Sequence, residues 1–253
     1  MNTEELKGKT ALVTGGSHRI GEAISLCLAD AGMNIVIHYP FSPDETTDLK
    51  RILDKKGTKS WTVKADFARE EEYATLIERT LEMTGSLHVL INNASIFPKG
   101  SLKDVTFKDL VENIQVNAWA PFVLIRDFAR LVGCGHVVNI IDSRITSYDW
   151  SHAAYILSKY MLAKLTDMTA LTLAPDITIN AVGPGLILPP PGEDEKYLDA
   201  LADTVPMKKH GDPEYVARAV LYLVTSEYLD GQIIFVDGGR HLKEYGGGSN
   251  PHY

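Results

Sequence analysis

Short apolar runs rich in β-branched residues alternate along this chain with longer segments whose apolar residues recur at helical spacing. The runs predict seven strands, over residues 10–14, 34–38, 61–64, 88–91, 136–140, 178–182 and 232–236. The segments between them predict helices over residues 20–31, 43–56, 70–83, 107–131, 153–173 and 213–225. Fully apolar runs are typical of strands buried on both faces, and βα crossovers are right-handed. The pattern therefore predicts an α/β fold with a doubly wound, parallel seven-stranded sheet and helices on both faces.

The chain length and composition fit one domain. The 253 residues are 45% hydrophobic, enough for one sizeable core, and no break in composition divides them. We expect a single domain over residues 1–242, followed by a flexible, Gly-rich tail over 243–253. Prolines interrupt residues 183–210, at Pro184, Pro189, Pro190, Pro191 and Pro206. Because proline disfavours regular structure and irregular segments this long are often functional, we expect a substrate lid over residues 186–210.

Charge and cysteine content exclude several classes of function. A net charge of −8 disfavours nucleic-acid binding. The charged start, MNTEELKGK, and the absence of an apolar stretch of about 18 residues argue against export or a membrane span, so we expect a cytoplasmic protein. Cys27 and Cys134 lie outside any cluster with metal-ligand spacing. We therefore expect no metal site and two buried cysteines.

A glycine-rich loop follows the first predicted strand and leads directly into the first predicted helix. It reads TGGSHRIG over residues 14–21. Gly15 suits a tight turn, Gly21 allows close helix packing, and the helix start offers free N–H groups and a positive dipole end to a pyrophosphate. The loop predicts dinucleotide binding, although a similar pattern also occurs in ordinary βα turns.

Further motifs at predicted strand ends resemble those of the short-chain dehydrogenase/reductase superfamily. They are Asn92-Asn93-Ala94, Asn117, Tyr155 with Lys159 four residues later, Gly183-Pro184-Gly185 and Val236-Asp237-Gly238-Gly239. The resemblance covers essentially the whole chain and implies a Rossmann-type fold that binds a nicotinamide dinucleotide. It implies a cofactor site formed by Gly15, Ser17, His18, Arg19, Ile20, His38, Tyr39, Ser42, Asp66, Phe67, Asn93, Ala94, Ser95, Tyr155, Lys159, Gly185 and Leu186.

The end of the second strand indicates which cofactor is bound. An acidic side chain there would bind a ribose 2′-hydroxyl and repel a 2′-phosphate, but this chain has His38-Tyr39. Donor side chains lie nearby in sequence, namely His18, Arg19 and Ser42. We therefore expect NADP(H) rather than NAD(H), and we expect His38→Asp to favour NADH, although no Lys or Arg follows His38 until Lys50. Asp66 resembles the family's adenine-contacting acid, or it could cap the helix that begins at Glu70.

The expected catalytic residues come from one predicted helix and its neighbours. Tyr155 and Lys159 are four residues apart and so share a helix face. An adjacent ammonium would lower the pKa of the Tyr155 hydroxyl, which would donate a proton as hydride arrives. The resemblance further implies that Lys159 binds the nicotinamide ribose and that Asn117 anchors a water chain to it. Asn117 could instead make a hydrogen bond at a helix kink.

Two departures from the superfamily pattern resemble its pteridine reductase branch. Arg19 stands where most members have glycine, and Asp142 stands thirteen residues before Tyr155, where most have serine. Substrate-contacting residues implied by this resemblance are Arg19, Ser95, Phe97, Asp142 and Tyr155. Phe97 would stack on a flat pterin ring, and Asp142 would be a second proton carrier, its pKa raised by partial burial. Phe97 could instead only line a pocket, Arg19 could bind phosphate alone, and Ser143 could take the serine role.

We therefore expect an NADPH-dependent reductase of a pterin- or folate-type heterocycle. The alternative is a carbonyl or alcohol oxidoreductase of the same superfamily, acting on a 3-oxoacyl, sugar or polyol substrate. A non-catalytic dinucleotide sensor is disfavoured because Tyr155 and Lys159 are both present. The two long helices over 107–131 and 153–173 resemble those that family members use to form dimers and tetramers, so we expect a homo-oligomer.

Overall fold

The structure is a computed structural model that describes residues 3–147, 151–190 and 192–243. Its centre is a parallel sheet of seven strands in the order β3-β2-β1-β4-β5-β6-β7. The strands are β1 (Thr10–Val13), β2 (Asn34–Tyr39), β3 (Ser60–Lys64), β4 (Val89–Asn92), β5 (Gly135–Ile140), β6 (Ile177–Pro184) and β7 (Ile233–Val236). The predicted doubly wound parallel sheet is confirmed.

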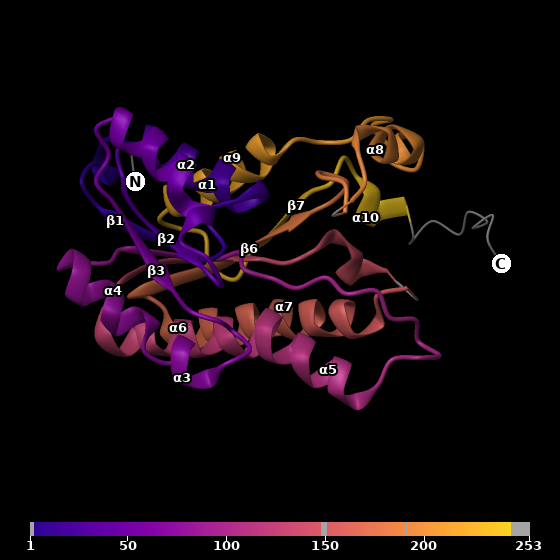
Figure 1. Ribbon diagram of the computed structural model, residues 1–253, viewed down its shortest axis with the longest axis horizontal. Helices are drawn as coiled ribbons and strands as arrows, with labels where there is room; N and C mark the ends of the chain where they lie inside the picture. Colours follow the sequence, from indigo (N-terminus) through magenta and orange to yellow (C-terminus); the bar gives the residue numbers. More distant parts are fainter. Residues whose placement is uncertain (1–2, 148–150, 191, 244–253) are drawn as a thin grey trace.

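Helices cover both faces of this sheet (Figure 1). One layer contains α1 (Arg19–Asp30), α2 (Asp44–Lys55) and α9 (Pro213–Val224), and the other contains α4 (Leu76–Thr84), α5 (Phe107–Ile114), α6 (Ala120–Leu131) and α7 (Ala153–Leu173). Successive strand residues point to opposite faces, so Ala11 and Val13 pack in one apolar cluster and Leu12 packs in the other. Each fully buried aliphatic side chain of these clusters contributes about 1.5 to 3 kcal/mol.

The predicted helix over residues 70–83 is two helices, α3 (Glu70–Tyr73) and α4. Arg79 Nη2 donates a hydrogen bond of 2.8 Å to the carbonyl oxygen of Glu72, the acceptor that a continuous helix would offer to the N–H of Leu76. The predicted helix over 107–131 is continuous, but a π-helical turn, η2 (Gln115–Trp119), joins α5 to α6. Such turns often occur at functional sites.

The proline-rich segment contains more regular structure than we expected. β6 extends to Pro184, and α8 (Glu195–Ala202) lies between the prolines, where its N-cap Asp194 accepts a hydrogen bond from the N–H of Lys196. Leu198 of α8 packs with Leu186 and Val205. The prediction that prolines exclude regular structure here was wrong because they flank residues 195–202 and do not interrupt them. Pro191 lies outside the described residues.

Smaller elements are η1 (Thr3–Leu6), η3 (Ser143–Thr146) and α10 (Arg240–Lys243), and the predicted tail beyond α10 lies outside the described residues. The prediction of two buried cysteines was also wrong. Cys27 is only partly buried and Cys134 is exposed. Cys134 lies in the short connection between α6 and β5, where Gly133 and Gly135 have positive φ angles and the chain turns at the surface.

Candidate active site

The predicted site residues gather at the carboxyl ends of the central strands. The strand order reverses between the adjacent strands β1 and β4: the chain continues from β1 to β2 on one side and from β4 to β5 on the other. Ligands of doubly wound folds bind in the crevice at such a point. The glycine-rich loop after β1, the segment after β4, η3 after β5 and Gly185 after β6 all lie at this edge of the sheet.

Hydrogen bonds between the loops after β1 and β4 fix this crevice. Thr14 Oγ1 accepts the N–H groups of Asn93 and Ala94 at 2.9 and 3.0 Å. Asn93 Nδ2 donates to the carbonyl oxygens of Thr14 and Gly15 at 2.9 and 3.0 Å. A side chain at Gly21 would clash with the Gly15 carbonyl, so the helix can start this close to the loop only with glycine there. Thr14 was not predicted, although its place before the glycines was a usable signal.

The first turn of α1 is open to an anion. His18, at its N-cap, makes no side-chain capping hydrogen bond, so the first N–H groups of the helix, including that of Ile20, are left to a ligand. Ser17 is buried in the loop. Gly15 has a φ of +58° and turns the chain sharply here. These residues fit the pyrophosphate of a dinucleotide.

Arg19 connects the glycine-rich loop to the predicted lid. It has a φ of +56°, a conformation that is rare for residues other than glycine, and its Nη2 donates a hydrogen bond of 2.7 Å to the carbonyl oxygen of Pro189. The side chain is exposed at the edge of the crevice. Arg19 therefore links the loop to the segment after β6. A phosphate that bound Arg19 as predicted would share the guanidinium with the Pro189 carbonyl oxygen.

His38 does not offer a donor to the cofactor in this structure. Its side chain is buried, Nδ1 accepts the N–H of Gly15 at 3.0 Å, and Nε2 donates to the carbonyl oxygen of Ala65 at 2.8 Å. Its ring stacks on Phe67, 4.6 Å between centroids. Burial lowers the pKa of His38 to about 4, so the ring is neutral. The expectation that His38 binds a 2′-phosphate is corrected, because packing against β3 turns the side chain inward.

The predicted donor Ser42 is paired with a carboxylate that the sequence argument did not count. Ser42, a predicted donor, hydrogen-bonds to Asp44 at the start of α2, 3.4 Å between oxygens. Tyr39 is largely buried at the end of β2. Asp66 Oδ1 accepts the N–H of Ala68, so it caps the turn after β3 and not α3 itself, whose N-cap is Arg69.

Tyr155, Lys159 and Asp142 come together in the deepest part of the site. The Tyr155 hydroxyl donates a hydrogen bond of 2.9 Å to Asp142 Oδ2. Lys159 Nζ lies 5.8 Å from the centre of the Tyr155 ring and donates to the carbonyl oxygen of Ile140 at 2.8 Å. Ser143 is buried, and its carbonyl oxygen accepts the hydroxyl of Thr146. The geometry therefore brings Asp142, and not Ser143, to the tyrosine.

Two of the expected pKa shifts have the opposite direction. Burial, followed by the negative charge of Asp142, raises the pKa of Tyr155 well above its ordinary value. Burial favours the protonated form of Asp142, but the charge and hydrogen bonds of Arg144 outweigh it, so the pKa of Asp142 is lowered. Burial lowers the pKa of Lys159 to about 8. The carboxylate beside Tyr155 thus has more influence on the phenol than the ammonium has.

Asn117 lies in the π-helical turn, and its amide is fully engaged with protein groups. Oδ1 accepts Ser95 Oγ at 3.0 Å and the N–H of Ile96 at 2.8 Å, while Nδ2 donates to the Ile96 carbonyl and to Ser158 Oγ. Ser158 in turn donates to the carbonyl oxygen of Tyr155. Asn117 therefore fixes the segment after β4 against the helix that carries Tyr155, and Ser95 is turned toward Asn117.

Phe97 lies beside the predicted catalytic residue Tyr155, with two neighbours that the sequence argument missed. The His152 ring is parallel to the Phe97 ring within 11°, 4.0 Å between centroids, and the Arg144 guanidinium lies 4.9 Å from the Phe97 centroid. The Tyr155 ring meets Phe97 edge-on at 4.6 Å. A flat ligand would have to displace one of these neighbours to stack on Phe97. The position of Arg144, two residues after Asp142, was the sequence signal that could have predicted its ion pair with Asp142.

Gly185 and Leu186 complete the edge of the site after β6. A side chain at Gly185 would collide with Asp237, whose carboxylate accepts the N–H groups of Gly239 and His241. Leu186 is buried against α8. The Gly183-Pro184-Gly185 motif therefore allows β6 and the segment after β7 to approach closely.

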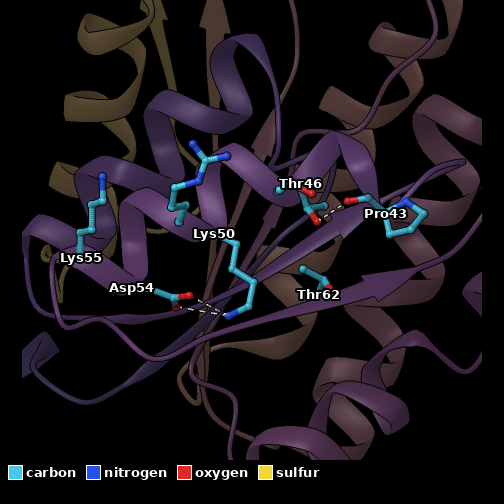
Figure 2. A pocket seen from close by; sticks show the side chains of 8 residues that line it. Pro43, Thr46, Lys50, Asp54, Lys55 and Thr62 are labelled. Atoms are coloured by element: carbon cyan, nitrogen blue, oxygen red, sulfur yellow. Dashed lines mark hydrogen bonds and ion pairs between the residues drawn. The ribbon is translucent and has the colours of Figure 1, made fainter.

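A separate surface hollow lies away from these residues (Figure 2). It has a volume of about 650 Å³ and lies between α2 and β3, lined by residues that include Pro43, Lys50 and Asp54. Lys50 Nζ is paired at 3.2 Å with Asp54, four residues later on α2. None of its lining residues belongs to the predicted site, so we do not assign the chemistry to it.

Known proteins resemble this chain over nearly its whole length. A family model described as enoyl-(acyl carrier protein) reductase matches residues 15–241. The chain belongs to the short-chain dehydrogenase/reductase superfamily. Glucose 1-dehydrogenase 2 of Bacillus subtilis is 31% identical over 250 residues, covering 94% of this chain and 97% of that protein. The 3-oxoacyl-[acyl-carrier-protein] reductase of Staphylococcus epidermidis is 29% identical, covering 92% and 99%.

Among solved structures, FolM alternative dihydrofolate reductase 1 of Brucella canis, crystallised with NADP, is similar with a TM-score of 0.90. It is 28% identical, and the match covers 100% of this chain and 99% of that one. The superfamily resemblance predicted from the sequence is thus confirmed, and the chain is an oxidoreductase by family. This structural neighbour is named as a dihydrofolate reductase, while the sequence relatives include sugar and oxoacyl enzymes.

The described residues contain neither a metal-binding group of side chains nor a membrane-spanning helix. In residues 3–147, 151–190 and 192–243, no three His, Cys, Asp or Glu side chains group together as they would around a metal ion. Within the same residues, every helix is too short or too polar to span a membrane.

Proposed function

We propose that this protein is an NADP(H)-dependent reductase of a pterin- or folate-type heterocycle. The observation that carries the proposal is the direct hydrogen bond of the Tyr155 hydroxyl to Asp142, at the position where most superfamily members have serine. Phe97 edge-on to Tyr155 supports it, because an aromatic ring beside the proton donor suits a flat heterocycle. The similarity to a FolM dihydrofolate reductase supports the same substrate class.

NADP(H) is supported by the absence of an acidic residue at the end of β2 and by the NADP bound to structural neighbours. The N–H groups at the start of α1 would hold its pyrophosphate, and Lys159 would hold the nicotinamide ribose. When bound, the cofactor supplies the hydride. If Ser42 faces the 2′-phosphate, its partner Asp44 would act against that phosphate, and exposed donors such as Arg19 and His18 would have to outweigh it.

The residues of the chain would then donate the proton and position the groups around the substrate. Tyr155 would donate the proton of its hydroxyl to the substrate nitrogen. Because this hydroxyl has one hydrogen, the O–H would turn from Asp142 to the substrate as the proton is transferred. Asn117 would keep the Ser95 segment at a fixed distance from α7 through Ser158. Because Tyr155 and Lys159 are buried, the proton is transferred with little competing water.

The second candidate is a carbonyl or alcohol oxidoreductase. It is favoured by the similarity to a glucose dehydrogenase and to a 3-oxoacyl reductase. The same Tyr155 and Lys159 would serve it, while Phe97 and Asp142 would be incidental. The two candidates therefore differ in the substrate and not in the cofactor.

A substrate panel tests the proposal. The purified protein is mixed with NADPH and with oxidised biopterin, dihydrobiopterin, folate, dihydrofolate, an acetoacetyl thioester or a simple ketone, and the loss of NADPH absorbance is followed. Glucose with NADP⁺ tests the reverse direction. We expect turnover with the pterins or folates, abolished in Tyr155→Phe. Turnover confined to the ketones, the thioester or glucose would favour the second candidate.

We also propose that the protein is a homo-oligomer. Large apolar side chains are exposed along the two long helices, among them Phe107 at 81% and Leu171 at 86% of their full area. Burial of such side chains against a second copy would stabilise a closed assembly. Sedimentation velocity measures the state directly, and a monomer at micromolar concentration would contradict this proposal.

A further inference from the structure

The carboxylate of Asp142 is surrounded by hydrogen-bond donors. Oδ1 accepts the backbone N–H of Arg144 at 2.8 Å and Arg144 Nε at 3.0 Å. Oδ2 accepts Arg144 Nη2 at 2.8 Å and the Tyr155 hydroxyl at 2.9 Å. A carboxylate has about four lone-pair sites, so these four donors fill it. A proton added to either oxygen would meet a donor and would break one of the four bonds.

The short helix η3 places the donors of Arg144 around the Asp142 carboxylate. Asp142 is the N-cap of η3, and Arg144 lies two residues later, so the backbone and the guanidinium of one residue reach both oxygens. The guanidinium pairs with the carboxylate through two parallel hydrogen bonds, the geometry for which arginine is suited and lysine is not. It also lies over the rings of Phe97 and Tyr155, at 4.9 and 5.4 Å. Its side chain is only 22% exposed.

We propose that Arg144 is a positioning residue for the reaction: it fixes the Asp142 carboxylate as the acceptor of the Tyr155 hydroxyl, so that Asp142 anchors the proton donor and is not itself a proton source. The charged and titratable groups around Asp142 are Arg144 of η3 with Tyr155 and Lys159 of α7. On the other side of Arg144, Arg240 and His241 of α10 share a small hollow with it. His152, at the N-cap of α7, stacks on Phe97.

The proposal assigns the protons of one turnover. The substrate gains an electron pair and a hydrogen as hydride. It gains one proton when the Tyr155 hydroxyl turns from Asp142 to the substrate nitrogen, the O–H bond breaks and an N–H bond forms. The phenolate that remains must take its next proton from solvent, because Asp142 has none to give. This rests on the proposed function for the identity of the substrate atom only. The pKa of Asp142, lowered by the charge and hydrogen bonds of Arg144 against the effect of burial, agrees with the geometry.

Infrared difference spectroscopy of the protein without substrate tests this arrangement. Samples labelled with [4-¹³C]aspartate are titrated between about pH 5 and 8, and the Asp142 band is assigned from Asp142→Asn. We expect Asp142 to be ionised throughout in the wild type. In Arg144→Gln burial is no longer opposed, so the midpoint of Asp142 rises into the titrated range, above about pH 5. In Arg144→Lys, which keeps a charge without the paired geometry, the midpoint lies between the two.

The pH dependence of kcat/KM is the second measurement, with whichever substrate of the panel is reduced. We expect the rate of Arg144→Gln to fall on the acid side, with a midpoint at least about one pH unit above that of the wild type, because a protonated Asp142 holds Tyr155 poorly. The matched control is Arg130→Gln, which removes an exposed arginine paired with Asp127 on α6, and its profile should coincide with the wild type.

Two results would overturn the role of Arg144. One is an Asp142 band that stays ionised in Arg144→Gln down to about pH 5. The other is a rate that rises as Asp142 takes up its proton, which would make the carboxyl a proton source. The infrared result does not depend on the substrate, so a failure of pterin reduction in the panel would contradict the proposed function and leave this inference standing.

Discussion

Replacing His38 with Asn keeps one of its two hydrogen bonds, removes the other and removes a buried titratable ring. The N–H of Gly15 donates to His38 Nδ1, and Asn Oδ1 can take nearly the same place. The bond from Nε2 to the Ala65 carbonyl and the stacking on Phe67 are lost. Because the Ala65 carbonyl is left buried without this partner, we expect a loss of about 1 to 3 kcal/mol of unfolding free energy at neutral pH.

The pH dependence gives a sharper test. The pKa of His38 is about 4 in the folded protein, against an ordinary value of 6.5, because of burial. The unfolded chain therefore takes up a proton below about pH 6.5 that the folded protein does not bind, and stability falls with pH until the folded ring also titrates. The 2.5-unit difference corresponds to a maximum of about 3 kcal/mol, and to about 2.5 kcal/mol between about pH 7.5 and 4.5.

Urea unfolding at these two pH values measures the effect. Other groups also titrate over this range, so the quantity of interest is the difference between the two proteins. The wild type should lose about 2.5 kcal/mol more than His38→Asn as the pH falls from about 7.5 to about 4.5. If the two proteins lose the same free energy, His38 is not a buried neutral group, and the account of how the glycine-rich loop is held is refuted.

Four other substitutions test the site. His38→Asp should destabilise the fold, because the new carboxylate would face the buried side of β2. It should leave the preference for NADPH over NADH unchanged, and a tenfold gain in NADH affinity in a cofactor titration would contradict this. Asp142→Ala should lower turnover at least about a hundredfold while Ser143→Ala changes it little, and steady-state kinetics showing the reverse would favour the carbonyl reductase. Phe97→Ala should weaken the binding of pterin-type ligands, measured by calorimetry, by about 1 to 3 kcal/mol and leave the affinity for NADPH nearly unchanged. If cofactor binding and thermal stability fall together instead, Phe97 is a packing residue.

Most of the fold could be predicted because its signals are local. The alternation of β-branched runs with helical periods determines which segments are strands, and crossover handedness then restricts their order. Where the prediction failed, side-chain contacts that the periodicity does not encode changed the outcome. Arg79 takes the carbonyl of Glu72 and ends α3 early, and Leu198 of α8 packs on Leu186, which precedes the helix.

The sequence by itself determined how residues are placed along its elements: Gly15 in the loop after the first strand, Gly21 in the helix that follows it, and Tyr155 and Lys159 on one helix face. These depend on fixed repeats of the backbone, which spacing reveals. The tertiary structure alone decided what those residues face. His38 turns inward because Ala65 of the neighbouring strand segment offers it an acceptor, and the pKa of Tyr155 rises because burial and Asp142 outweigh Lys159. Burial and the distance between charges depend on packing, and neither is recorded in sequence spacing.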